Sequence, residues 1–151
     1  MSKLQKAVVA RILLFALFWL SGCSFFSTPI NISGLWEGTI TWTSGPATGI
    51  ETILRLDLLH EDRDLSGAVT LGGPGGTSYQ LAIESGTART VSMTLTASGV
   101  LPINPPQDVR LTLSGDFLGD EMSGTGTQMI NGVPYTITWV AHLTAPAAPQ
   151  E

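Results

Sequence analysis

The feature that most constrains the fold is an alternation of apolar and polar residues, which recurs in short segments from residue 35 to residue 141. The clearest case alternates Thr and Ser with four apolar residues: Val91, Met93, Leu95 and Ala97. A period of two places successive side chains on opposite faces of a β-strand. We therefore expect a strand here, with an apolar face turned toward a core and a hydroxyl-bearing face turned away from it.

The same alternation predicts seven further strands, separated by turn-forming residues at short and regular spacing. These strands are expected at residues 35–43, 51–59, 65–71, 79–83, 109–114, 122–130 and 135–141. Asn131-Gly132 lies between the last two, and this dipeptide favours a two-residue hairpin turn because both positions need positive φ. From residue 30 onward we find no helical periodicity, so the pattern is typical of an all-β protein.

Eight strands joined by short links favour a single small antiparallel up-and-down barrel. Eight is a number at which such a sheet can close and lose its edges. A β-sandwich would give the same alternation and remains the alternative. A membrane-spanning barrel also alternates, but with its apolar face outward. We expect the opposite orientation, with the apolar residues inside and Thr and Ser outside.

The first residues form a separate segment with the features of a secretory signal peptide. Lys3, Lys6 and Arg11 come before an uninterrupted apolar run, residues 12–20, and small residues follow. A positive start, a short apolar stretch and a small-residue cleavage site are typical of such signals. A membrane-spanning helix needs about 20 apolar residues, so this run is too short to be one.

Leu20-Ser21-Gly22-Cys23 resembles the lipobox of bacterial lipoproteins. The resemblance implies cleavage between Gly22 and Cys23, diacylglycerol on the Cys23 thiol and an acyl chain on its new amino group. No other cofactor is expected. Simple secretion with a free thiol is the alternative. Cys23 is the only cysteine of the chain, so it has no partner for an internal disulfide.

These features divide the chain into four parts. Residues 1–22 would be the lipoprotein signal peptide, 23–31 a lipidated tether, 32–144 the barrel domain and 145–151 a disordered tail. The resemblance implies a bacterial cell-envelope protein that is held at a membrane by its lipid anchor. Ser24 stands where an Asp would retain a lipoprotein in the inner membrane, which favours the outer membrane in a Gram-negative host.

The charge of the mature chain excludes some partners. Removal of residues 1–22 takes away two lysines and one arginine, which leaves four arginines, no lysine and 12 acidic residues, a formal charge of −8. Nucleic-acid binding needs clustered basic residues to neutralise phosphates, so we expect no nucleic-acid partner. The remaining 129 residues suit one domain, which we expect to be a monomer.

The loops expected at the end of the barrel away from the N-terminus are rich in Gly and Pro and almost uncharged. They would form the mouth of the barrel, and large side chains on the inward faces could line an apolar pocket behind it. The candidate lining residues are Trp42, Tyr79, Met93, Tyr135 and Trp139. The alternative is that these side chains simply fill the core, as in other small eight-stranded barrels.

Other chemistry has weaker support in the sequence. Glu61, Asp62 and Asp64 could bind Ca²⁺ through carboxylate oxygens, but their spacing is not that of a calcium loop, so we favour a solvated hairpin and expect no metal. The two histidines, His60 and His142, are expected to be exposed. No G-x-S-x-G nucleophile motif is present, and we expect that the protein is not an enzyme.

Gly34-x-Trp36, at the start of the first expected strand, resembles the G-x-W motif of the calycin barrels, which include lipocalins and avidins. The resemblance implies a ligand-binding barrel. The first functional hypothesis is therefore a lipid-anchored lipoprotein that binds a small apolar ligand or carrier cargo. The second is a protein-interaction module, either an envelope assembly factor or an inhibitor of an exported hydrolase.

Overall fold

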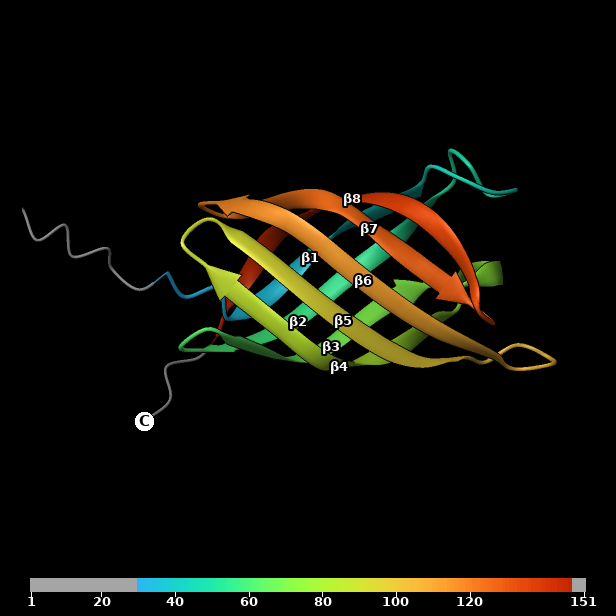
Figure 1. Cartoon of the computed structure of the whole chain (residues 1–151), viewed down its shortest axis with the longest axis horizontal. Coiled ribbons are helices and arrows are strands. Elements are labelled where there is room, and N and C mark those ends of the chain that lie inside the picture. The colour runs from blue at the N-terminus through green and yellow to red at the C-terminus, as the bar shows by residue number, and fades with distance from the viewer. Residues whose placement is uncertain (1–29, 148–151) are drawn as a thin grey trace, which may run out of the picture.

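The computed structural model describes residues 30–147, which form a closed barrel of eight strands (Figure 1). The strands are β1 (Gly34–Trp42), β2 (Glu51–Glu61), β3 (Asp64–Gly72), β4 (Ser78–Arg89), β5 (Ser92–Leu101), β6 (Gln107–Leu118), β7 (Glu121–Ile130) and β8 (Val133–Pro146). One short 3₁₀ turn, η1 (Pro74–Gly76), lies between β3 and β4. The prediction of an all-β up-and-down barrel is confirmed, and the sandwich alternative was wrong.

Each strand pairs antiparallel with the next, and β1 closes the sheet by pairing with β8. This last pairing runs from Gly34 opposite Pro146 to Trp42 opposite Ile137. Closure gives every strand two neighbours, so the sheet has no unpaired edge that could pair with another chain.

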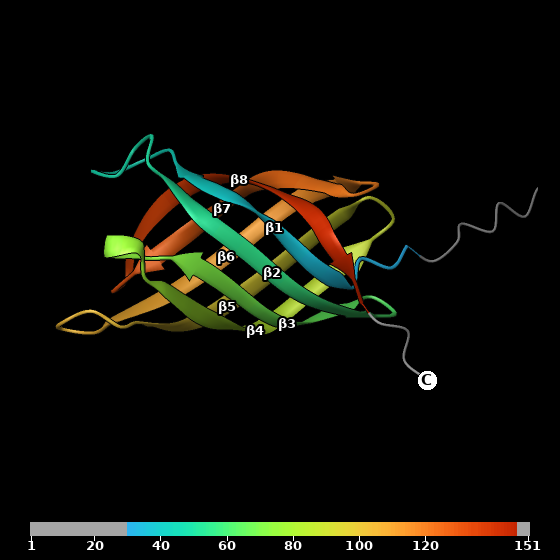
Figure 2. The same ribbon diagram turned by 180° about the vertical axis from the view of Figure 1, so that it is seen from behind.

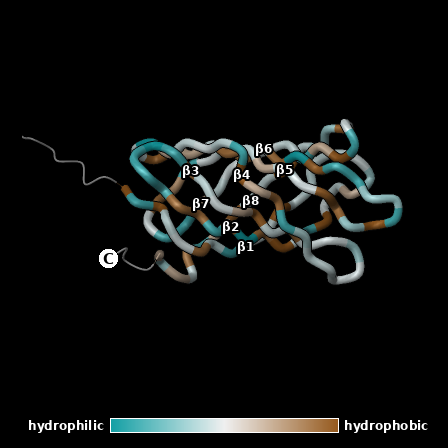
Figure 3. Tube along the Cα trace, turned by 90° about the horizontal axis from the view of Figure 1, so that it is seen from below, coloured by the Kyte–Doolittle hydropathy of each residue, from teal (hydrophilic) through white to brown (hydrophobic). Residues whose placement is uncertain are grey.

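The apolar residues face inward, as the alternation predicted. Their side chains form one continuous core cluster, whose largest fully buried members are Trp36, Ile40, Leu54, Leu56, Leu71, Leu81, Met93, Leu95, Leu111, Leu113, Met122 and Ile137. Figure 3 shows hydropathy changing repeatedly along the chain as its strands alternate. The outward positions hold mainly Thr, Ser and charged residues.

The two ends of the barrel differ in their connections (Figures 1 and 2). The end at which residue 30 enters has three two-residue turns, at 62–63, 90–91 and 119–120. We call it the N-terminal end. The opposite end, the mouth, has longer loops at 43–50, 73–77 and 102–106 and one short turn, Asn131-Gly132. Both residues of that turn have positive φ, at 48° and 81°, as expected for this hairpin.

The N-terminal end is closed by the residues just before β1. The indole N–H of Trp36, a side chain that is 1% exposed, donates a hydrogen bond of 2.9 Å to the carbonyl of Ile32. The backbone N–H of His60 donates to the Ser33 hydroxyl at 2.8 Å. The bond between His60 and Ser33 ties the entering chain to the end of β2, and Ile32 joins the core cluster there.

Strand β4 is longer than the sequence predicted because it contains a bulge. The register with β5 shifts between Ile83 and Ser85, which moves the next inward positions from odd to even residues. Ala88 is therefore buried, and β4 continues to Arg89. A one-residue insertion of this kind interrupts the alternation, which is why the expected strand ended at Ile83.

Two expectations near strand ends were wrong. Val91 was expected on an inward face, but it lies in the β4–β5 turn and is 55% exposed. Ala145 and Pro146 were expected in the C-terminal tail, but they belong to β8 and pair with Leu35 and Gly34. Residues 148–151 of that tail lie outside the described residues.

Candidate functional site

A cavity of about 410 Å³ opens at the mouth of the barrel. Its walls come from β1, β2, β3, β4, β5 and β7 and from the loops between them. The lining residues are Trp42, Ala47, Ile50, Glu51, Thr52, Gly72, Gly73, Pro74, Tyr79, Leu101, Gln128 and Ile130. This volume lies within the range of about 300–1,000 Å³ that is usual for small-molecule sites, and most of the lining is apolar.

Two buried polar side chains meet in this cavity. The amide N–H of Gln128 donates a hydrogen bond of 3.0 Å to the hydroxyl oxygen of Tyr79, and the two side chains come from strands β7 and β4. Gln128 is 3% exposed and Tyr79 is 7% exposed. The Tyr79 hydroxyl accepts this bond and keeps its own proton to donate. A ligand with an oxygen acceptor could therefore bind here.

Burial raises the pKa of the Tyr79 hydroxyl above its usual value of 10.0, and the hydrogen bond from Gln128 offsets part of that effect. The hydroxyl therefore stays protonated at neutral pH and serves as a hydrogen-bond donor.

Trp42 forms one wall of the cavity and packs against Tyr135. Its ring centroid lies 5.1 Å from that of Tyr135, with the planes tilted by 41°. The β1–β2 loop is fixed over this pair because the backbone N–H of Thr136 donates to the Ser44 hydroxyl at 2.8 Å. Such an aromatic pair holds the indole face in a defined position.

The five residues predicted to line a pocket are not all at the cavity. Trp42 and Tyr79 line it, while Tyr135 contacts Trp42. Met93 and Trp139 are buried in the core cluster at 1% and 4% exposure and are not among the lining residues. The Trp139 indole N–H donates to backbone carbonyls of Thr125 and Ser114, at 3.1 and 3.3 Å.

Sequence reasoning missed Gln128, although a signal for it was present. Met122, Gly124, Gly126, Gln128 and Ile130 occupy one parity of β7, and Met122 is fully buried. A Gln on that inward parity must find a polar partner, because an unpaired buried amide is costly. The loop residues Ile50 and Pro74 carried no comparable signal, since nothing local says that they meet.

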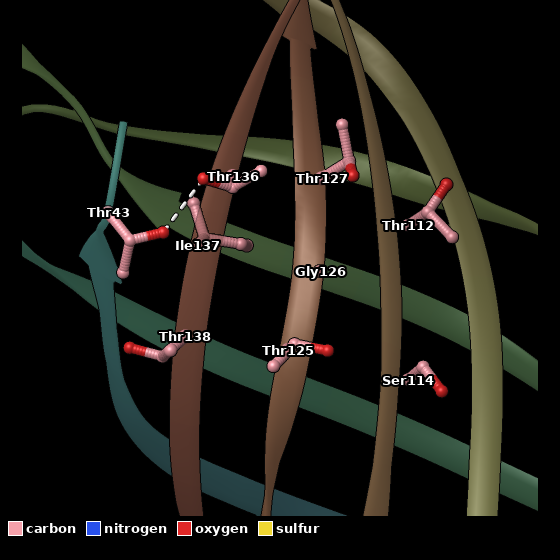
Figure 4. Close-up of a pocket in the computed structure, with 9 residues that line it drawn as sticks. All are labelled: Thr43, Thr112, Ser114, Thr125, Gly126, Thr127, Thr136, Ile137 and Thr138. Atoms are coloured by element: carbon pink, nitrogen blue, oxygen red, sulfur yellow. Dashed lines mark hydrogen bonds between the residues drawn. The ribbon is translucent and has the colours of Figure 1, made fainter. Parts of the chain in front are cut away.

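A second hollow, of about 480 Å³, lies on the outer wall and is rich in hydroxyl groups (Figure 4). It is lined by Thr43, Thr112, Ser114, Thr125, Gly126, Thr127, Thr136, Ile137 and Thr138. The hydroxyls of Thr43 and Thr136 lie 2.8 Å apart and share a hydrogen bond. Cross-strand Thr pairs of this kind stabilise a sheet. The hollow contains no charged or aromatic residue that would anchor a ligand.

The acidic β2–β3 turn is exposed to solvent. Glu61, Asp62 and Asp64 are all exposed, and Glu61 pairs with Asp64 across the hairpin. Within residues 30–147 no group of three or more His, Cys, Asp or Glu side chains is arranged to hold a metal ion. The turn is therefore an exposed, charged hairpin in the structure, and the Ca²⁺ hypothesis gains no support from its geometry.

The two histidines differ in environment. His142 is exposed on β8 as expected, with Nδ1 3.8 Å from a carboxylate oxygen of Glu121. His60 was also expected to be exposed, but it is half-buried, and its Nδ1 accepts a bond of 3.4 Å from the backbone N–H of Ile32. His60 thus belongs to the closed N-terminal end. The two histidines lie on different strands, β2 and β8.

Several predicted features lie outside the described residues. These are the signal peptide 1–22, the cleavage site at Gly22 and Cys23, and lipidation at Cys23. Across residues 30–147 the structure contains no helix with the length and hydropathy required to span a membrane.

Comparison of the chain with models of protein families, with curated proteins and with solved structures found no match.

Proposed function

We propose that the protein is a lipid-anchored lipoprotein of the bacterial cell envelope whose barrel binds a small apolar ligand at its mouth. The observation that carries the proposal is the mouth cavity, which combines apolar walls with one buried polar pair, Tyr79 and Gln128. Sites for small molecules are commonly apolar and concave, with a few polar groups that fix the orientation of the ligand. The eight-stranded barrel and the Gly34-x-Trp36 motif add support through their resemblance to the calycins.

Binding is proposed in preference to catalysis because of the composition of the cavity. Glu51 is the only charged residue among those that line it, and no His, Cys or Lys is among them. General acid–base or nucleophilic chemistry needs a base within hydrogen-bond reach of the group it activates. The Tyr79–Gln128 pair can orient a ligand, but neither side chain is a base at neutral pH.

The anchor is proposed from the sequence of residues 20–23. The fold determines which end of the barrel such an anchor would hold near the membrane. The chain enters the barrel at the end opposite the mouth (Figure 1). Acylation at Cys23 would keep the N-terminal end within reach of the membrane, with the mouth at the far end of the barrel. A ligand would then reach the cavity from the aqueous side.

The ligand-binding proposal is tested with N-phenyl-1-naphthylamine, a neutral fluorescent probe that brightens in apolar sites. We expect saturable binding by the wild type and at least a tenfold weaker affinity for Trp42→Ala. Ile53→Ser is the matched control, because Ile53 is 68% exposed and is not among the residues that line the cavity. No saturable binding by the wild type, or equal binding by Trp42→Ala, contradicts the proposal.

The anchor is tested separately by mass spectrometry of the full-length protein purified in mild detergent from its host. We expect the mass of residues 23–151 plus diacylglycerol and one N-acyl chain. An unmodified chain, or one that retains residues 1–22, contradicts the anchor. Non-covalent mass that survives gentle ionisation would identify the natural ligand directly.

A second candidate, a protein-interaction module, is favoured by exposed apolar residues around the mouth. Val100 and Val133 are each 50% exposed, and Met129 is 37% exposed. A groove of about 360 Å³ includes Val100 and Met129, with Asp108 and Arg110 beside them. Exposed apolar residues bordered by charges are typical of protein contacts.

The second candidate is tested by photocrosslinking in the host. A photoreactive residue at Val133 should give one discrete adduct, whereas the same residue at Thr125, on the outer wall, should not. Equal crosslinking at both positions argues against a specific partner at the mouth.

A further inference from the structure

The N-terminal end carries an apolar pair of side chains for which neither the core nor the mouth cavity accounts. Leu118, the last residue of β6, is 85% exposed, and Val91, in the β4–β5 turn, is 55% exposed. The backbone N–H of Phe117 donates to the carbonyl of Val91 at 2.8 Å, so the β4–β5 turn is bonded to the end of β6, one residue before Leu118. We call Val91 and Leu118 the apolar tips.

The apolar tips lie at the end of the barrel where the chain enters. Figures 1 and 2 show the β4–β5 and β6–β7 turns at the same end as the segment that leads into β1. Ile30, in that segment, is 40% exposed. Cys23 precedes Ile30 by seven residues, which span at most about 25 Å when extended. If Cys23 is acylated, this end is held within that reach of the membrane surface.

We propose that the apolar tips insert into the interface of the bilayer and seat the barrel end-on upon its membrane. Leu and other apolar side chains favour the boundary between headgroups and acyl chains, and a lipid anchor keeps them within reach of it. The inference rests on the proposed anchor. It goes further because an anchor alone leaves the barrel free to tumble, whereas inserted tips fix its axis and hold the mouth toward the aqueous phase.

The charges at this end select the kind of bilayer. Its turns carry five carboxylates, those of Glu61, Asp62, Asp64, Asp120 and Glu121, and two arginines, Arg63 and Arg89. Anionic headgroups would repel this excess of negative charge. The bilayer that fits this end is therefore zwitterionic, and it accepts the apolar tips without the need for a basic patch.

The single cysteine of the chain makes a direct test possible. In the acylated protein the Cys23 thiol is occupied, so an introduced cysteine is the only free thiol. The variants Leu118→Cys, Val91→Cys and Val133→Cys are labelled with an environment-sensitive fluorophore. They are then placed on phosphatidylcholine vesicles that contain a quencher attached to the acyl chains. Val133, at the mouth and 50% exposed, is the control.

We expect the labels at positions 118 and 91 to be quenched at least fivefold more than the label at 133. Equal quenching at all three positions, or none at 118 and 91, overturns the inference even when mass spectrometry shows the acyl chains. An unacylated chain overturns the inference together with the anchor. Probe binding at the mouth is unaffected in each case, so the ligand-binding proposal is judged independently.

A second measurement separates insertion from simple tethering. The variant Thr90→Cys, beside Val91, carries the fluorophore, and its quenching is measured in two backgrounds. One background is the double variant Val91→Ser, Leu118→Ser, and the matched control is Val100→Ser, Val133→Ser. We expect quenching to fall at least threefold in the first background and to remain unchanged in the second. Quenching that persists in the first background shows that the tether alone brings this end to the membrane, and overturns the inference.

Discussion

The two ends of the barrel are built from the same eight strands, but side chains fill one end and a cavity lies at the other. At the N-terminal end, two-residue turns leave little room, and Trp36 and Ile32 close the interior. At the mouth, longer loops hold the walls apart and a cavity of about 410 Å³ remains. If the mouth cavity binds a ligand as proposed, the filled end and the binding end lie at opposite ends of the barrel axis. The experiments below test this separation, from the largest expected effect to the smallest.

Removal of the closing tryptophan should have the largest effect. Trp36→Ala should lower the free energy of unfolding by about 3–5 kcal/mol, because it leaves a cavity among buried side chains and the carbonyl of Ile32 loses its indole donor. Trp42→Ala, at the mouth, should cost less than about 2 kcal/mol because Trp42 is only half-buried. Urea unfolding of both variants measures the difference, and equal losses would break the comparison.

Longer connections should have the next largest effect, and their cost in stability should differ between the two ends. Two extra glycines between Gly75 and Gly76, in the η1 loop, should cost about 0.6 kcal/mol or less, because loop-closure entropy grows slowly with length. The same insertion between Gly119 and Asp120 should cost more than the insertion in the η1 loop, since that two-residue turn sets the register of β6 with β7. Urea midpoints check both values, and equal tolerance would show that the short turns constrain the N-terminal end no more than the long loops constrain the mouth.

The polar pair at the mouth should give a pH dependence at alkaline pH. The pKa of Tyr79 is raised in the folded state, so above about pH 10 the unfolded chain loses this proton first and stability falls as the pH rises. Below pH 10 both states hold the proton and the effect vanishes. Tyr79→Phe should therefore flatten the decline in stability above pH 10. A decline of the same steepness in both proteins would show that this hydroxyl is not buried.

The outer wall should contribute least. Arg110 and Glu84 lie 3.2 Å apart but remain 59% and 44% exposed. Glu84→Gln should change the free energy of unfolding by no more than about 0.5 kcal/mol, because exposed ion pairs are weak. Thermal unfolding at low and high salt provides the measurement. A loss comparable to that of Trp36→Ala would mean that this exposed ion pair matters as much as a buried core side chain.

The sequence predicted the architecture well because every second side chain of a barrel strand faces the interior, so burial produces a regular alternation. Leu111 and Leu113 on β6, for example, face inward as their alternation with Arg110 and Thr112 required. It failed where the backbone leaves that period. The bulge after Ile83 and the turn position of Val91 depend on pairing with β5 and β6, which no local pattern records.

The candidate site was predicted only in part, for a related physical reason. Inward parity identifies which side chains enter the barrel, so Trp42 and Tyr79 were found. It does not say how far along the barrel axis the interior is filled. Met93 and Trp139 were therefore grouped with them although both lie in the core. The height of the cavity is set by loops from several hairpins that meet only in the folded chain.

The pairing of β1 with β8 has a consequence for the order of events in folding. Gly34 pairs with Pro146, which lies near the other end of the described chain. The β1–β8 pairing therefore cannot form until β8 is available. Until then β1 offers an unpaired edge, and the interior is open along that side. A chain exported from its N-terminus onward would therefore form at most an open sheet on the far side of the membrane, and the barrel would close only after β8 emerges. Deletion of a few C-terminal residues of β8 should thus trap a species that aggregates through strand β1.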